Sequence, residues 1–550
     1  MSPGKLEVLE VVTDRFARAQ GRIHAHKDAS VSKVSLFATV SNQHLLIATL
    51  LIAGYLIWGC IGLTQSPGFS LDEPATADPA MSLISSGHLA FPSAGPENFN
   101  EETSLYNLPL HPVVLSLVFR LLGAGLWQGR LFSLACACVC LLITYIAGRS
   151  ISPAVGVVAI CILAVDPLFT YRSREIRYDW LALIGLMVGW LLALRAVMNP
   201  KSFGSTIAMV GSGIAVAIAV SSHILYLGAV PVVGLAWLTL SLLRRTQPLR
   251  IMRSIMSYCA GFVVGLVPVA QYCLRYTDAV KGQMLRQMRD AHGPSETATL
   301  WVKGEAGKYF VYYRSTPLLF VLLCLGLTVF LCLALRESQH LATSDFGGSS
   351  LIPMGICCVG LPVWVGFASN HHAWHHLMVA PFWALGAGVG LIELRLWLRS
   401  MRIRAVFDCC VAVALMSAFG VSILGRTLIA VVTWGERDVT AYYASIRRVI
   451  PEGRERVYGD YRLLFLAREA GWRFIARYYP AAEVKGQIDY VVLSELTEAP
   501  AWLDMKPYEL VATIGNKRID RHGIVGKARN IFGEAPLPLS FRIYKARSSP

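Results

Sequence analysis

The sequence predicts a polytopic α-helical membrane protein with a small α/β domain at its C-terminal end. Hydrophobic residues make up 55% of the 550 residues and charged residues only 15%, against roughly 25% in typical soluble domains. Apolar runs of about 20 residues recur, and each is long enough to cross roughly 30 Å of hydrocarbon. From Trp434 the pattern changes. There "ERVYGDYRLLFLAREAGWRFIARYYP" indicates a strand, a turn and a helix, and "IDYVVLSE" and "LSFRIYKA" indicate two further strands.

The apolar runs predict about eleven membrane spans. Residues 1–44 carry several basic residues and no cleavable signal pattern, so we interpret them as a cytoplasmic leader. We expect a membrane domain over 45–433 and a soluble domain over 434–550. The predicted spans are approximately 45–64, 130–148, 152–170, 179–197, 204–221, 223–243, 254–274, 316–335, 351–368, 374–394 and 405–433.

Basic residues predict the orientation of the chain. With the N-terminus in the cytoplasm, the arginine cluster at 244–253 lies inside, whereas loop 65–108 contains no Lys or Arg. This asymmetry is the positive-inside pattern, and it places residues 434–550 outside the cytoplasm of a multi-pass inner (plasma) membrane protein. A span at 109–127 would reverse this pattern. We therefore expect that segment to form an interfacial helix within the first external loop, 65–129.

The formal charge of +15 does not indicate nucleic acid, because basic residues collect in the cytoplasmic loops of membrane proteins. All 13 cysteines lie in or beside apolar segments, and no Cys-x-x-Cys pattern is present. We expect no structural disulfides.

An acidic pair, Asp72 and Glu73, follows the first predicted span in "SLDEPATA". Such a pair could simply begin a helix, with Ser70 or Asp72 as N-cap and Pro74 in the first turn. The next external loop, "DPLFTYRSREIRYDW", favours a functional interpretation. Ionisable groups at that depth usually face a cavity, and this loop brings four of them: Arg172, Arg174, Arg177 and Asp179.

Four histidines occur in "SNHHAWHHL", at the external end of another predicted span: His371, His372, His375 and His376. Three interpretations remain open. The histidines could bind a divalent metal through pairs spaced four residues apart, contact a substrate phosphate, or serve the structure alone. No cofactor is certain, and a divalent metal is possible.

The motif run "LDE…SSGHL…LPLHPVVLSLVFRLLG…DPLFTYRSREIRYD" resembles the GT-C class of integral-membrane glycosyltransferases. It is most similar to bacterial relatives of the protein mannosyltransferases and of the aminoarabinose transferase that modifies lipid A. The resemblance is strong over about 60–200. It implies transfer of a sugar from a polyprenyl-phosphate donor on the far side of the membrane.

By the same resemblance, Asp72 matches the catalytic aspartate of the first loop and Glu73 its acidic neighbour, while Arg177 and Asp179 match the pair of the second loop. The chain departs from its relatives at "LPLHP", which contains His111, and at His375-His376. The predicted catalytic residues are thus Asp72, Glu73 and Asp179. The predicted substrate-binding residues are Arg172, Arg174, Arg177, His111, His375 and His376, and no metal ligand is assigned.

The chemistry is consistent with this prediction. A lipid phosphate that leaves as an anion needs fixed cations, and arginine binds phosphate bidentately. Asp72 would take the proton from the acceptor hydroxyl as general base, and a single displacement would invert the sugar carbon. The acceptor could be a protein, a glycolipid or a polysaccharide. The alternative is a transporter or flippase of a lipid-linked anion, although the sequence shows no related halves or helices broken at the midplane, which are typical of transporters.

Overall fold

The computed structural model divides into two units, residues 1–51 and residues 52–550. Within the first unit it describes the N-terminal part of helix α2 (Lys33–Cys60). For 33–41, 337–343, 366–368, 373–375 and 435–436 only the backbone is described. The described residues are 33–70, 72–90, 92–93, 108–198, 203–244, 246–278, 281, 309, 311–343, 351–368, 373–398, 400–476, 488–494, 499–500, 502–515 and 540–547.

Helices occupy each of the eleven predicted spans, which confirms the α-helical polytopic fold. Within the described residues, eight helical segments are long and apolar enough to cross a membrane. They are Asn42–Cys60 of α2, Leu126–Arg149 (α5), Asp179–Met198 (α8), Phe203–Ser222 (α9), Ile224–Leu243 (η1, Ile224–Gly228, with α10, Ala229–Leu243), Pro248–Arg275 (α11), Pro317–Arg336 of α14 (Pro317–Thr343), and Met401–Val432 (α17, Met401–Phe419, to α18, Arg426–Val432).

Three predicted spans correspond to helices outside this set: α6 (Pro153–Val165), α15 (Leu351–Ala368) and α16 (Ala380–Trp397). The run predicted at 152–170 is broken after α6, because Asp166 caps a separate helix, α7 (Pro167–Arg172), by accepting from the backbone N–H groups of Leu168 and Phe169. α6 alone has 13 residues, which is about 20 Å. The prediction of one continuous span there was therefore wrong.

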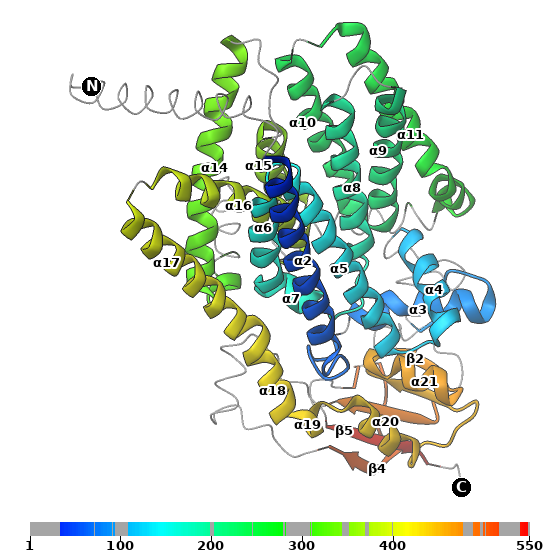
Figure 1. Cartoon of the computed structure of the whole chain (residues 1–550). Coiled ribbons are helices and arrows are strands. Elements are labelled where there is room, and N and C mark those ends of the chain that lie inside the picture. Colours follow the sequence, from blue (N-terminus) through cyan, green and yellow to red (C-terminus); the bar gives the residue numbers. More distant parts are fainter. Residues whose placement is uncertain are drawn as a thin grey trace. The chain divides into compact units, whose positions relative to one another are not determined.

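Small residues let the membrane helices approach closely. A Cβ atom at Gly213 of α9 would lie 2.1 Å from the Tyr258 carbonyl oxygen, and one at Gly261 of α11 would lie 2.1 Å from the Val210 carbonyl oxygen. Only glycine fits at these crossings, as is typical of helix packing in membranes. Helices α8, α9 and α11 consequently lie side by side (Figure 1).

Two shorter helices connect the first spans. α3 (Asp72–Ser86) begins at the acidic pair, and α4 (Leu110–Leu122) occupies the segment predicted to be interfacial. α4 has 13 residues, too few to cross a bilayer. It buries His111, Leu115 and Phe119 at a spacing of four, whereas its opposite face exposes leucines. Its position at the membrane interface stays a prediction.

The C-terminal part forms a five-stranded sheet in the order β2-β1-β3-β5-β4. β1 pairs in parallel with both β2 and β3, and β5 pairs antiparallel with β3 and β4. We call this sheet, with helices α20 (Val439–Arg447) and α21 (Leu464–Ala470), the α/β region. The strands are β1 (Arg456–Gly459), β2 (Arg473–Ala476), β3 (Tyr490–Ser494), β4 (Tyr508–Ile514) and β5 (Phe541–Ala546).

The strands predicted from sequence correspond to β1, β3 and β5. One prediction was wrong, because the helix expected to run through "LAREAGWRFIA" ends early. Gly471 adopts a left-handed conformation (φ 76°) at the end of α21, which terminates the helix, and β2 follows directly. β4 was not predicted.

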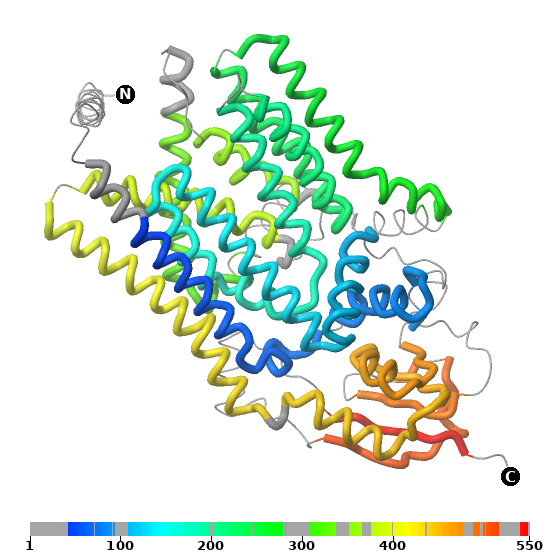
Figure 2. Tube along the Cα trace, turned by 45° about the vertical axis from the view of Figure 1, so that its right-hand side comes forward, coloured from blue at the N-terminus to red at the C-terminus, as the bar shows by residue number. Residues whose placement is uncertain are grey.

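The α/β region shares one apolar core with helices α3 and α4. Ala77 and Met81 of α3 and Leu115 and Phe119 of α4 belong to the same buried cluster as α21 and β1, and the rings of Phe69 and Phe465 lie 5.9 Å apart. Figure 2 shows the α/β region beside α3 and α4. The boundaries 45–433 and 434–550 stay predictions, and residues from both sides of that boundary contribute to this core.

Candidate active site

Helix α3 begins with two carboxylates in different environments: that of Asp72 faces solvent, and that of Glu73 is buried. The Asp72 side chain is 48% exposed and the Glu73 side chain is fully buried. Both stand in the first turn of the helix, where the backbone N–H groups favour negative charge. Adjacent helix positions point in different directions, so the two carboxylates occupy different environments.

Glu73 is held by four hydrogen bonds. Arg130, on α5, donates from Nε to Oε1 (2.8 Å) and from Nη2 to Oε2 (2.7 Å). The backbone N–H groups of Ile176 and Ser70 donate to the same two oxygens, each at 3.0 Å. A carboxylate has about four acceptor positions, and here all are used. Glu73 therefore ties the start of α3 to α5 and to the loop before α8, which suits a positioning role. The catalytic role expected from sequence stays a prediction.

Arg177 joins the two loops at their acidic residues. Its Nη1 donates to Asp72 Oδ2 (3.0 Å) and its Nε donates to Asp179 Oδ2 (2.8 Å). The guanidinium is buried, and its Nη2 has no hydrogen-bond partner among the described residues. The structure thus brings together three residues that the sequence predicted as a group, and it leaves one edge of the arginine as an unused donor.

Two histidines lie next to this group. His223 Nε2 is 3.8 Å from Asp179 Oδ1. His111 is completely buried beside Phe132, and neither of its ring nitrogens has a hydrogen-bond partner in the described part of the chain. Burial lowers the pKa of His111 to about 3, with the charge of Asp179 opposing the shift. The imidazole is therefore neutral at ordinary pH and can donate or accept one hydrogen bond.

The other two predicted arginines point elsewhere. Arg174 donates to the Ile61 carbonyl and stacks over the Trp58 ring, 5.2 Å from its centroid. Arg172 forms an ion pair with Glu175. Arg174 thus anchors the second loop to the end of α2, and the Arg172 ion pair joins two residues of the same loop.

Arg174→Lys should leave transfer activity within a few-fold of the native rate, because a lysine near Trp58 keeps the charge and the contacts described for Arg174 are to Ile61 and Trp58. The lost guanidinium stacking should cost about 0.5–1 kcal/mol of stability. Turnover and thermal denaturation in detergent measure the two effects separately. A loss of turnover as large as that of an Arg177 variant would contradict this placement.

His376 belongs to a second buried cluster. Tyr313 donates from its hydroxyl to Asp166 Oδ2 (2.6 Å), and the Tyr313 hydroxyl oxygen lies 3.3 Å from His376 Nε2. His371 and His372 lie outside the described residues, and so does the side chain of His375. Among the side chains that the structure describes, no three or more His, Cys, Asp or Glu residues are grouped as a metal site requires.

Sequence reasoning missed Arg130 and Glu175. Arg130 stands near the external start of an otherwise apolar helix, and that isolated charge is a signal that could have found it. Glu175 is buried between the arginines of "YRSREIRYD", and its Oε1 has no partner among the described residues. Burial raises the pKa of this carboxyl, against the opposing charge of Arg172.

Residues 107–272 match the family described as dolichyl-phosphate-mannose-protein mannosyltransferase. Among solved structures, ArnT from Cupriavidus metallidurans bound to undecaprenyl phosphate is 14% identical, with a TM-score of 0.59 over 90% of this chain and 97% of that one. Its apo state is 15% identical, with a TM-score of 0.56 over 81% and 92%. This chain has the GT-C fold. The class recognised from the motifs is thereby confirmed.

A more distant GT-C structure is the oligosaccharyltransferase of Archaeoglobus fulgidus in its apo form. It is 11% identical, with a TM-score of 0.50 over 82% of this chain and 69% of that one. No curated protein matches the chain in sequence. The family match contains Arg130, Arg177 and Asp179 but begins after Asp72 and Glu73. The acidic pair is connected to the matched segment by its hydrogen bonds to Arg130 and Arg177.

Proposed function

We propose that the chain transfers a sugar from a polyprenyl-phosphate-linked donor to an acceptor outside the cytoplasm, with Asp72 as general base. One observation carries the proposal. Asp72 is half exposed while its Oδ2 is held by Arg177, and the same arginine keeps a buried, unpartnered Nη2. This arrangement supports the proposal, because it puts an accessible carboxylate next to an arginine with a donor to spare.

The reaction is a single displacement. The acceptor hydroxyl attacks the anomeric carbon and its proton passes to Asp72 Oδ1, which takes no hydrogen bond from the described residues. The bond between the anomeric carbon and the phosphate oxygen breaks, and its electron pair stays on the lipid phosphate. In this proposal the buried Arg177 Nη2 donates to the lipid phosphate and stabilises this charge. Attack from the face opposite the leaving group inverts the sugar carbon.

The donor class is supported by the fold. The ArnT structure binds undecaprenyl phosphate, and a membrane-carried donor suits a site beside apolar helices. The proposal places the chain in the inner (plasma) membrane, with the N-terminus in the cytoplasm and the α/β region outside. Its acceptor is a protein, a glycolipid or a polysaccharide, and transfer is measured with an acceptor of each class.

Transfer is tested with the full chain in proteoliposomes that contain a radiolabelled polyprenyl-phosphate sugar. Label should move to an added acceptor, and free polyprenyl phosphate should accumulate. A transporter would instead carry the intact labelled lipid to the opposite leaflet with no labelled product. That result would overturn the proposal in favour of the alternative.

Orientation gives a further expected result. A cysteine at Arg454, an exposed residue before β1, should react with a membrane-impermeant maleimide in right-side-out vesicles. A cysteine at Gln247, an exposed residue before α11, should react only after the vesicles are opened. The native chain, with its 13 cysteines, gives the background. The reverse labelling pattern would place the active site in the cytoplasm.

A further inference from the structure

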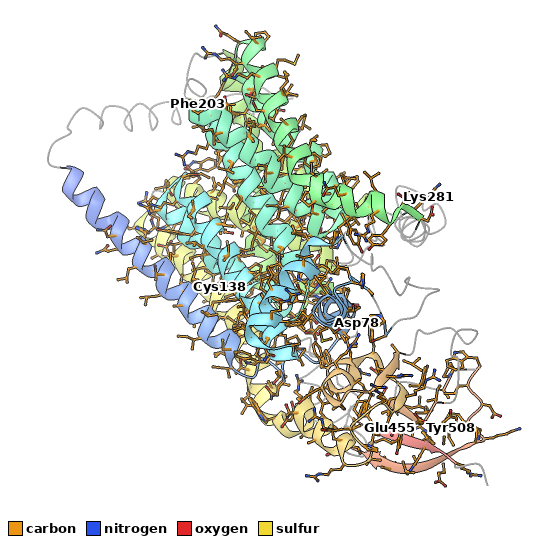
Figure 3. The ribbon with its side chains drawn as sticks, turned by 90° about the vertical axis from the view of Figure 1, so that its right-hand side faces the viewer. Asp78, Cys138, Phe203, Lys281, Glu455 and Tyr508 are labelled. Atoms are coloured by element: carbon orange, nitrogen blue, oxygen red, sulfur yellow. The ribbon has the colours of Figure 1, made fainter. Side chains whose placement is uncertain are left out.

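α3 is held at a second point, six residues after Asp72, by another buried carboxylate. Asp78 is completely buried. Its Oδ1 accepts from Arg468 Nη2 (3.1 Å), and its Oδ2 accepts from the Tyr461 hydroxyl and the Ser93 backbone N–H, both at 3.3 Å. Figure 3 shows Asp78 on α3 next to the α/β region.

The partners of Asp78 belong chiefly to the α/β region. Arg468 lies on α21, and Tyr461 lies in the turn that follows β1. The backbone N–H of Ala476, on β2, donates to the Ser93 carbonyl at 2.8 Å. Three elements of the α/β region thus converge on α3 and on the residue pair 92–93, through hydrogen bonds as well as through the shared apolar core.

A buried carboxylate is a costly way to attach two surfaces. Burial raises the pKa of Asp78, against the opposing charge of Arg468, which shows that the ionised form loses hydration here. Apolar side chains of similar volume often hold such surfaces together equally well. Hydrogen bonds are directional, unlike apolar contacts. Those of the carboxylate therefore fix the rotation of α3 about its own axis as well as its contact with the α/β region.

The position of Asp78 in the helix is suited to controlling Asp72. Pro79 lies inside α3, and a proline removes one helical hydrogen bond and bends the helix. The missing bond is the one to the Ala75 carbonyl, so the weakened turn is 75–79, and Asp78 lies within it. The hydrogen bonds of Asp78 therefore hold α3 where its own bonding is weakest, about 9 Å along the helix axis from Asp72, while Glu73 and Arg130 fix the start of the helix.

We propose that Asp78 is a positioning residue through which the α/β region sets the orientation of α3, and thereby the placement of Asp72 against Arg177. This inference rests on the proposed role of Asp72 as base. It assigns the α/β region a direct part in the rate of transfer, because misplacing a reacting group by about 1 Å can lower a rate by about 10²-fold.

Three variants of the full-length chain test this inference: Asp78→Asn, Arg468→Gln and Tyr461→Phe. Asparagine places an N–H donor among groups that all donate, and glutamine removes the charge from Arg468. Phenylalanine keeps the ring in the core and removes only the hydroxyl. Asp78→Asn and Arg468→Gln should lower kcat about 10–10²-fold per donor-binding molecule, with donor affinity unchanged because Arg177 is not on α3. Tyr461→Phe should have a smaller effect in the same direction.

The double variant Asp78→Asn, Arg468→Gln should recover part of kcat, because two amides can hydrogen-bond to each other without charge. The matched control is Arg447→Gln, which removes the ion pairs of this half-buried arginine with the exposed Glu469 (2.7 Å) and Glu452 (3.7 Å) on the same region and should leave kcat unchanged. Variants that lose yield or thermal stability but keep the native kcat per donor-binding molecule would show a structural role only, and would overturn the proposal.

Hydrogen exchange gives a readout that is independent of activity. Arg468→Gln should speed amide exchange in the 72–78 segment, whereas Arg447→Gln should not. Unchanged exchange in both would contradict the inference. If the native chain transfers no sugar at all, the proposed function fails. If the native chain transfers, Asp72→Asn does not, and the Asp78 and Arg468 variants keep full kcat, only this inference fails.

Discussion

Asp72→Asn should lower the rate of sugar transfer about 10²–10⁴-fold, the usual contribution of one general base. Asparagine keeps the size of the side chain and can still accept a hydrogen bond from Arg177, so α3 and the second loop should stay in place. The amide cannot take the proton of the acceptor hydroxyl. Transfer measured in proteoliposomes should therefore fall, while donor affinity measured by titration of the lipid-linked sugar should not.

The matched control is Asp504→Asn, at an exposed aspartate whose side chain accepts only the nearby backbone N–H of Lys506 in the described structure. It should transfer at the native rate. An Asp72→Asn protein that works within a few-fold of the native chain would remove Asp72 as the base. The same protein with weakened donor binding would mean that Asp72 acts mainly by orienting Arg177.

The acidic pair shows what sequence could and could not predict about the site. Motif resemblance identified both Asp72 and Glu73 as site residues, and adjacent positions suggested a shared role. Burial separates them: one carboxylate faces solvent and the other accepts four hydrogen bonds. The partner that decides this is Arg130, 57 residues further along the chain, and no local pattern predicts a contact over that separation.

The fold was predictable where the physical signal is local. Apolar runs marked the helices because hydrocarbon excludes polar side chains, and short stretches rich in β-branched and aromatic residues marked β1, β3 and β5. The predictions that were wrong lie where a single residue interrupts a continuous pattern. Asp166 breaks the run at 152–170 by capping α7, and Gly471 ends α21 so that an apolar stretch continues as β2. The shared core between the α/β region and α3 is a tertiary feature with no sequence signature.

The arginines of the second loop also show a difference between what sequence predicts and what tertiary contacts decide. Three of them occur within six residues, and sequence reasoning assigned all three to the substrate. The structure gives each a different partner: Glu175 for Arg172, the Ile61 carbonyl for Arg174, and two carboxylates for Arg177. Of these three contacts, that of Arg177 is to the proposed base, and its buried Nη2 has no partner among the described residues. Substitutions at Arg177 can therefore separate the effect of the guanidinium geometry from the effect of its positive charge.

Arg177→Lys should reduce transfer nearly as much as Arg177→Ala, by about 10²–10³-fold, the usual loss when one donor to a developing anion is removed. Lysine keeps the charge but not the planar fork, so a single ammonium cannot bond to Asp72, Asp179 and a phosphate in the present geometry. Donor affinity should fall in both variants, in contrast to Asp72→Asn.

Arg174→Lys, three residues earlier in the same loop, is the control for charge alone. If Arg177→Lys keeps native turnover and donor affinity, the loop contributes only positive potential, and the phosphate is bound elsewhere. If the lysine variant binds donor normally but transfers slowly, Arg177 acts on Asp72 and not on the leaving group. The expected pattern, with loss of both affinity and rate, is the one that requires Nη1 and Nη2 to work on the base and on the phosphate at the same time.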